Sequence, residues 1–200
     1  MRTIAWIIAG IVTLLLLLQL PTLLPRLGDR LIFGGISGSE PPLSCPEGML
    51  FIPTEDSGFC IDRFEAPNIE GKLPLRGLSM EQALEYCAQR GSRLCTEGEW
   101  YRACSGPQGN ASYIGECVNP SSEPQMSGSR THCFSPEGVA DLSGNILEWT
   151  SDGQPDPFAF FLKGGSYLTP DGYTSCGYQV VVLPGQSGLS RPDLGVRCCR

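Results

Sequence analysis

The chain has 200 residues, a formal net charge of −7 at pH 7 and ten cysteines. The negative charge argues against a nucleic-acid-binding protein, because phosphate binding needs an excess of lysine and arginine. The cysteine count indicates folding in an oxidising compartment, since thiols at this density form disulfides outside the cytosol.

The N-terminal segment is strongly apolar. Residues 4–20 read IAWIIAGIVTLLLLLQL, with Arg2 before them and no charge inside. As a helix this segment nearly spans the core of a bilayer, and PTLL, residues 21–24, would extend it. A cleaved signal peptide has a shorter apolar region followed by small residues, whereas PTLLPRLGDR follows here. We predict an uncleaved transmembrane anchor over residues 1–25 and an extracytoplasmic domain in the periplasm or at the cell surface; cleavage would instead release a secreted domain.

Residues 26–44 are predicted to be a linker, because GGISGSEPPLS over 34–44 combines flexible Gly and Ser with stiffer Pro. The folded domain is predicted over residues 45–200. MLFIP and FCIDRFE predict two strands around the turn TEDSG. Cys45 and Cys60 bracket these strands, so a disulfide between them is the first predicted pairing.

A helix is predicted in LSMEQALEYCAQRG, residues 78–91. Ser79 and Gln82 have the spacing of a capping box, and Gly91 is placed to end the helix. The residues predicted to face inward are Met80, Ala83, Leu84 and Cys87.

A second helix is predicted in CTEGEWYRACSG, residues 95–106. Thr96 and Glu99 repeat the capping box, and Trp100, Ala103 and Cys104 are predicted to face inward. We interpret Glu97, Glu99 and Trp100 as capping and core residues rather than as a site.

Residues 105–136 are rich in Gly, Ser, Pro and Asn without a sustained period, which predicts a loop. A loop of this length is usually either functional or held by a cross-link, and a disulfide between Cys117 and Cys133 is predicted to hold it. Beyond it, FAFFLKGGSY, YQVVVL and LGVRCC each predict a strand.

The stretch GVADLSGNILEWTSD, residues 138–152, places acidic residues, an asparagine and two glycines close together. Oxygen-bearing side chains at this spacing suit a hard cation, and they suit an ordinary solvated turn equally well. The residues alone leave both interpretations open.

Six stretches together resemble the sulfatase-modifying-factor, or formylglycine-generating-enzyme, domain. In chain order they are GMLFIP, CIDRFEAP, SMEQALEYCAQRGSRLCTEGEWYRAC, GVADLSGNILEWTSD, LKGGSY and LGVRCC. The resemblance covers nearly all of residues 45–200. It implies an α+β domain similar to C-type lectin folds, rich in loops, stapled by disulfides and with its two ends close together.

The resemblance also implies how the remaining cysteines pair. The family commonly joins its helix cysteines to the C-terminal strand and to the stretch after GGSY. This implies Cys87 with Cys198 and Cys104 with Cys176, and leaves Cys95 with Cys199. Because Cys198 and Cys199 are adjacent, their two partners are interchangeable on paper.

For residues 138–152 the resemblance implies a structural calcium site. The implied ligands are the side chains of Asp141 and Glu148 and the carbonyls of Gly144 and Ile146, a mixture that calcium favours. The alternative is that Asn145 makes a turn and Glu148 pairs with Arg93 or Arg197 inside the domain. No ligand can be transferred to the family's other calcium site, in the region of residues 113–136.

Copper enzymes of this family use two cysteine thiolates, a soft site for Cu(I), to convert a substrate cysteine to formylglycine. In this chain Thr169 and Thr174 occupy the positions of those two cysteines. Leu147 occupies the position where the copper enzymes commonly have a tryptophan that lines the oxygen-handling pocket. Ser166 matches the family's serine, and Cys176 lies two residues beyond Thr174. These last two are the remaining catalytic candidates, and copper is not expected as a cofactor.

We therefore predict a membrane-anchored, non-catalytic binding or structural module with a protein or peptide ligand. One rival is a formylglycine-generating oxidase that acts on a cysteine of sulfatases. Another is a scaffold or maturation factor of an envelope complex. A histidine-cluster iron enzyme is not expected, because His132 is the only histidine in the sequence.

Overall fold

The computed structural model describes residues 44–109, 117, 122–154, 159–170, 173–186 and 188–200. The predicted anchor and nearly all of the predicted linker lie outside these residues. Within the described ranges, no helix combines the length and apolar character needed to cross a membrane.

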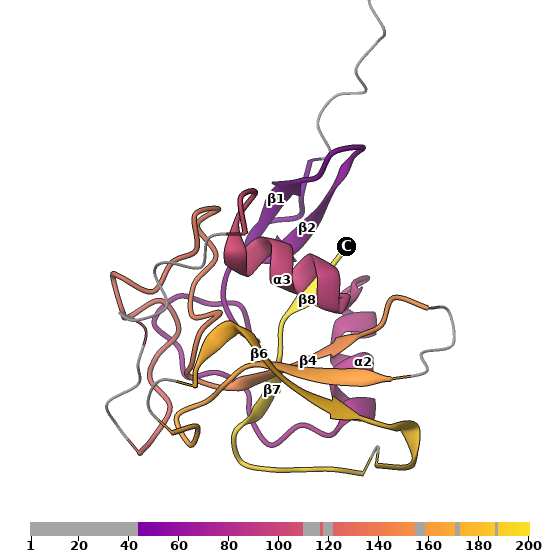
Figure 1. Cartoon of the computed structure of the whole chain (residues 1–200), viewed down its shortest axis with the longest axis vertical. Coiled ribbons are helices and arrows are strands. Elements are labelled where there is room, and N and C mark those ends of the chain that lie inside the picture. Colours follow the sequence, from indigo (N-terminus) through magenta and orange to yellow (C-terminus); the bar gives the residue numbers. More distant parts are fainter. Residues whose placement is uncertain (1–43, 110–116, 118–121, 155–158, 171–172, 187) are drawn as a thin grey trace, which may run out of the picture. The chain divides into compact units, whose positions relative to one another are not determined.

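Two four-stranded sheets form the framework of the domain (Figure 1). The first has the order β1–β2–β8–β3 with antiparallel pairing throughout, and consists of β1 (Met49–Pro53), β2 (Gly58–Asp62), β3 (Arg93–Leu94) and β8 (Cys198–Cys199). The second has the order β6–β5–β4–β7, and consists of β4 (Leu147–Ser151), β5 (Phe160–Gly164), β6 (Ser175–Val182) and β7 (Leu194–Val196). In it only the β4–β7 pair is parallel. A short 3-10 helix, η3 (Pro184–Gln186), follows β6.

Both predicted helices are confirmed, together with their capping boxes. In α2 (Met80–Gln89) the Ser79 hydroxyl accepts a hydrogen bond from the Gln82 amide, and the Gln82 side chain accepts one from the Ser79 amide. In α3 (Glu97–Ser105) Thr96 and Glu99 make the same reciprocal pair. These bonds satisfy amides that the first turn of a helix leaves without an intrahelical partner.

One residue of the predicted inward face of α2 is misplaced. Met80, Ala83 and Cys87 are buried as predicted, but Leu84 is 38% exposed. Because Leu84 directly follows Ala83, it is turned about 100° away around a helix and lies at the edge of the buried face. The helix therefore has a narrower apolar face than the sequence predicted.

The strands differ from the sequence prediction in three places. FCIDRFE ends as a strand at Asp62, and LGVRCC divides into β7 and β8, which belong to different sheets. Residues 147–151, within the stretch interpreted as a turn or ion loop, form β4, and every residue of β4 is buried. A strand covered on both faces lacks the alternation of polar and apolar residues that marks a half-exposed strand.

The core consists of two clusters. In the first, α2 packs against the second sheet, with Met80 and Ala83 beside Trp149 and Leu162. In the second, α3 lies between the β1–β2 hairpin and the second sheet, as Figure 1 shows, and buries Trp100 with Ile61 and Leu142. Leu147, where the family's copper enzymes carry a tryptophan, is buried in the first cluster.

Five disulfides connect these layers, and they are the five pairs expected from the sequence and the resemblance: Cys45–Cys60, Cys87–Cys198, Cys95–Cys199, Cys104–Cys176 and Cys117–Cys133. No cysteine is free. The backbone of Arg200 exchanges two hydrogen bonds with that of Cys60, each 2.9 Å long. The two ends of the domain therefore meet at β2, as the resemblance implies.

Candidate functional site

A buried aspartate holds the turn that leads into β4. Asp141 is 1% exposed and has a φ of 59°, a left-handed backbone conformation that few non-glycine residues adopt. Its Oδ1 accepts hydrogen bonds from Arg130 Nη2 at 2.8 Å and from Arg130 Nε at 3.3 Å. Its Oδ2 accepts one from the amide of Gly128 at 2.6 Å. The loop before the turn thus supplies three donors to this carboxylate.

Asn145 ties the same turn to a second buried carboxylate. Its Nδ2 donates to both carboxylate oxygens of Glu65, each at 2.9 Å, and its Oδ1 accepts from the amide of Gln125 at 2.8 Å. Ser127 Oγ also donates to Glu65, at 2.7 Å. Burial raises the pKa of the Glu65 carboxyl well above its usual range, and two neighbouring carboxylates raise it further. Asn145 is therefore a turn residue that also fixes a partner 80 positions earlier in the chain.

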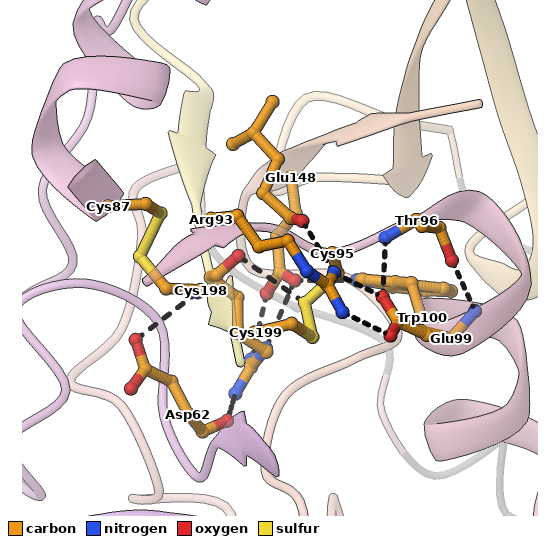
Figure 2. The surroundings of a disulfide bond; sticks show 12 residues. Asp62, Cys87, Arg93, Cys95, Thr96, Glu99, Trp100, Glu148, Cys198 and Cys199 are labelled. Atoms are coloured by element: carbon orange, nitrogen blue, oxygen red, sulfur yellow. Dashed lines mark hydrogen bonds and ion pairs between the residues drawn. A yellow bond between two sulfur atoms is a disulfide. The ribbon is translucent and has the colours of Figure 1, made fainter. Parts of the chain in front are cut away.

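Glu148 lies in β4 and is paired with Arg197, the residue between β7 and β8. Arg197 is fully buried, and it donates to Glu148 from Nη2 at 2.8 Å and from Nε at 3.1 Å. Trp100 Nε1 donates to the same carboxylate at 2.6 Å. Figure 2 shows Glu148 and Trp100 close to the Cys95–Cys199 disulfide. Arg197 also donates to the carbonyls of Asp62 and Ala140, and so joins β2, β4 and the turn.

The two carboxylates of the predicted calcium site each pair with an arginine. Asp141 is bonded to Arg130, and Glu148 to Arg197, which is the alternative considered for Glu148 from the sequence. A Cβ added to Gly144 would lie 3.7 Å from Arg130 Nη1, so the guanidinium lies against this glycine. Among the described residues, no cluster of three or more His, Cys, Asp or Glu side chains could hold a metal. The calcium prediction itself stays a prediction.

Ser166, Thr169 and Thr174 lie between β5 and β6. Ser166 Oγ donates to Asp193 at 2.6 Å, and the Ser166 amide donates to Thr169 Oγ1 at 2.9 Å. Thr174 is buried, and its Cγ2 lies 2.9 Å from the position that a Cβ would take on Gly165. The fold therefore brings Ser166, Thr169 and Thr174 together, as the family pattern implies, with hydroxyl groups at both positions where thiolates would bind copper.

Cys176 is the other catalytic candidate, and it is oxidised. It forms the disulfide with Cys104 of α3, with an S–S distance of 2.03 Å, and both residues are fully buried. A disulfide sulfur has no thiolate to act as a nucleophile or as a Cu(I) ligand. In this state the chain offers no thiol chemistry, because all ten cysteines are paired.

Glu97, Glu99 and Trp100, which we interpreted from the sequence as capping and core residues, all make structural contacts. Glu99 caps α3 and forms an ion pair with Arg93, with 2.6 Å between the closest atoms. Glu97 accepts a hydrogen bond of 2.7 Å from Lys163, which is itself buried beside the ring of Trp100. Burial raises the pKa of the Glu99 carboxyl, but the hydrogen bonds from Arg93 and Thr96 outweigh it and lower the pKa overall.

The sequence analysis missed four charged residues of these networks, namely Glu65, Arg130, Lys163 and Asp193. Each contacts a partner that lies 11 or more residues away in the sequence. No local pattern identifies such residues, because a buried charge differs from an exposed one only by what surrounds it.

A surface hollow of about 530 Å³ lies where α2, β3 and the β4–β5 hairpin meet. Leu84, Leu94 and Phe160 supply its apolar wall, and Arg93, Thr96 and Gln154 supply polar groups. Pockets that are mostly apolar with a few polar groups are typical of ligand sites.

The fold is shared with solved structures of low sequence identity. The structure of PvdO from Pseudomonas aeruginosa superposes with a TM-score of 0.58 at 13% identity, and the match covers 76% of this chain and 90% of that chain. At this identity the likeness shows the fold alone.

Comparison with protein families and curated relatives is more specific. The model of the "Sulfatase-modifying factor enzyme 1-like domain" matches residues 51–200. "Inactive C-alpha-formylglycine-generating enzyme 2" is 31% identical in Bos taurus and 33% identical in Mus musculus, over 150 residues and 64% of this chain in each case. The chain spans 50% of the bovine relative and 49% of the mouse relative, about half of their length. The chain therefore belongs to the family of sulfatase-modifying-factor-like domains, with the α+β, disulfide-rich fold that its motifs predicted.

Proposed function

We propose that this domain is a non-catalytic binding or structural module held at the extracytoplasmic face of a membrane. One observation carries the non-catalytic part: Thr169 and Thr174 occupy the positions of the copper thiolates, and both lie beside the Ser166 turn. A threonine hydroxyl is a hard, neutral oxygen donor, whereas Cu(I) prefers thiolate sulfur. The relatives named as inactive formylglycine-generating enzymes support the same conclusion.

The rival function is oxidation of a substrate cysteine, and a direct assay tests it. The purified full chain is incubated in air with Cu(I) and a cysteine-containing sulfatase peptide, and the peptide aldehyde is sought by mass spectrometry. We expect no aldehyde, because Cys176 is held in a disulfide with Cys104. Aldehyde formation that is abolished in Cys176→Ser would overturn the proposal.

The membrane part of the proposal is supported by the uncharged residues 4–20 and by the ten cysteines. The test compares the full chain with a variant that lacks residues 1–25, after alkaline carbonate extraction of the membranes. We expect the full chain to remain in the membrane pellet and the shortened chain to be soluble. Release of the full chain by carbonate would contradict an integral anchor.

The binding part of the proposal is supported by the hollow beside α2, whose apolar wall and polar groups suit a segment of a protein or peptide. Leu84 is an exposed member of that wall, so Leu84→Arg would fill the hollow with charge at little cost to the core. Once a ligand is in hand, we expect Leu84→Arg to weaken its binding while Glu85→Arg, at the exposed neighbouring position, does not. Equal binding by both variants would place the ligand elsewhere.

A further inference from the structure

The positive charge beside the buried Asp141 carboxylate is the guanidinium of Arg130. Arg130 is 12% exposed in its side chain, and it donates two hydrogen bonds to Asp141 from Nε and Nη2. Its remaining terminal nitrogen, Nη1, donates to the carbonyl of Cys117 at 2.5 Å. One guanidinium therefore binds a carboxylate and a backbone carbonyl, the two kinds of oxygen that a structural calcium would use.

A glycine at position 144 leaves room for the Arg130 guanidinium and its hydrogen-bond acceptor. Gly144 has a φ of 87°, and a Cβ there would lie 3.0 Å from the carbonyl oxygen of Cys117 and 3.7 Å from Arg130 Nη1. A larger residue at position 144 would therefore crowd the oxygen that receives the Arg130 hydrogen bond. The Asp141 turn and the loop that carries Arg130 therefore pack against each other at the Arg130 guanidinium.

Two of the three buried carboxyl groups around the turn are paired with arginine. Glu148 faces Arg197, and Asp141 faces Arg130, so two buried carboxylates meet two guanidinium groups. The third carboxyl group, Glu65, accepts hydrogen bonds from Asn145 Nδ2 and Ser127 Oγ. A divalent cation added beside Arg130 would meet a positive charge where it needs free anionic oxygen.

We propose that the guanidinium of Arg130 performs the structural task of a bound cation at the Asp141 turn, so that the domain keeps its stability without calcium. This proposal and the calcium prediction exclude each other. It does not depend on the proposed function, because it concerns how the turn is held and not what the domain binds.

The first test compares the melting temperature of the full chain in detergent with EDTA, with calcium and with magnesium. A structural calcium at one hundred times its Kd would raise the melting temperature by about 5–10 °C. We expect no calcium-specific shift. A rise of this size with calcium that EDTA reverses would overturn the proposal.

The second test replaces the internal cation. Arg130→Ala leaves a buried carboxylate without a counter-charge, and we expect its melting temperature to fall by about 10 °C. The control is Arg102→Ala, which breaks the more exposed ion pair between Arg102 and Glu137 and should cost about 2 °C or less. Equal shifts in the two variants would overturn the proposal.

A double variant covers the case in which Arg130→Ala fails to fold. Arg130→Ala with Asp141→Asn removes the stranded negative charge together with its partner. We expect this chain to fold and to melt above Arg130→Ala, still without a calcium-specific shift. A double variant that is no more stable than the single one would show that the ion pair is not what holds the turn, and would contradict the proposal.

Discussion

At the scale of single residues, the interior is organised by charged side chains whose partners come from distant parts of the chain. Arg197 is the best example, because it is fully buried and reaches Glu148, 49 positions away, and the carbonyl of Asp62, 135 positions away. Burial lowers the pKa of Arg197, but attraction by Glu148, hydrogen bonding to Glu148, and attraction by Glu65 and Asp141 together outweigh burial and raise the pKa overall. The fold therefore favours the charged form of Arg197 beside Glu148.

Breaking this pair should be costly. Arg197→Ala leaves the Glu148 carboxylate buried without its counter-charge, so we expect a loss of about 3–5 kcal/mol in the free energy of unfolding. The control is Arg93→Ala, since Arg93 is 49% exposed in its ion pair with Glu99 and should contribute about 1 kcal/mol or less. Urea denaturation followed by circular dichroism measures both losses, and similar values would refute a special role for Arg197.

Glu65 should make the stability of the domain depend on pH. Burial, followed by the charges of Asp141 and Glu148, raises the pKa of Glu65 in the folded protein, while the unfolded chain has an ordinary value of about 4.3. The folded state therefore holds a proton that the unfolded state has lost, and stability falls as the pH rises from the unfolded pKa toward the folded one.

Glu65→Gln removes this titration and keeps a similar shape. We expect the free energy of unfolding of the native chain to fall, relative to this variant, as the pH rises above the unfolded-state pKa of about 4.3. The comparison uses urea denaturation at each pH, with the exposed Glu85→Gln as a control that should track the native chain. Parallel curves for the native chain and Glu65→Gln would rule out the predicted linkage.

At the scale of elements, the site depends on how closely β7 approaches its surroundings. Gly195 of β7 pairs with Glu148 of β4, and a Cβ on Gly195 would lie 2.3 Å from Ile146 Cδ1 and 2.6 Å from the Leu75 carbonyl oxygen. Gly98 in α3 is the opposite case, because no atom outside the helix lies within 4 Å of a Cβ there. The same substitution should therefore have opposite effects in the two elements.

Gly195→Ala should destabilise the domain by about 1–3 kcal/mol, since the backbone carbonyl of Leu75 has to move. Gly98→Ala should stabilise it by about 0.4–1 kcal/mol, because alanine restricts the unfolded chain and favours the helix. Thermal melts of the two variants and the native chain give both signs. If Gly195→Ala leaves the melting temperature unchanged, β7 is free to shift away from β4.

At the scale of the whole molecule, the disulfides determine how a domain with short strands and long loops stays folded. Cys95–Cys199 and Cys87–Cys198 join the helical region to the C-terminal strand over separations of 104 and 111 residues, whereas Cys45–Cys60 spans 15. Longer closed loops remove more conformational entropy from the unfolded chain. Either C-terminal bridge alone keeps the long loop closed, so the two together, and not each one singly, should contribute most.

Replacing the cysteines of these bridges by serine tests this order. We expect the loss of both Cys87–Cys198 and Cys95–Cys199, as the fourfold serine variant, to cost about 5 kcal/mol or more, and the loss of Cys45–Cys60 to cost about 3 kcal/mol. Urea titrations of the two variants under non-reducing conditions measure the difference. The reverse order would show that native-state packing, and not loop entropy, decides the contribution of each bridge.

The sequence by itself determined the features that depend on a few adjacent residues or on the family's motifs. The capping boxes at Ser79 and Thr96 are local hydrogen-bond patterns, and they were predicted correctly together with the first hairpin. The absence of the copper thiolates was also readable, because Thr169 and Thr174 are identified by their spacing from the GGSY motif. The family and its disulfide-rich α+β fold followed from the motifs in order.

Only the tertiary structure decided which partner each buried charge takes. The sequence left Arg93 and Arg197 as possible ion-pair partners of Glu148, and in the fold Glu148 pairs with Arg197, because β4 and β7 run side by side and place the two residues together. The fold likewise pairs Asp141 with Arg130, a residue that no local pattern marked. The physical reason is that a buried charge is stabilised by groups brought to within about 3 Å by folding, and the distance along the chain does not reveal which groups those are.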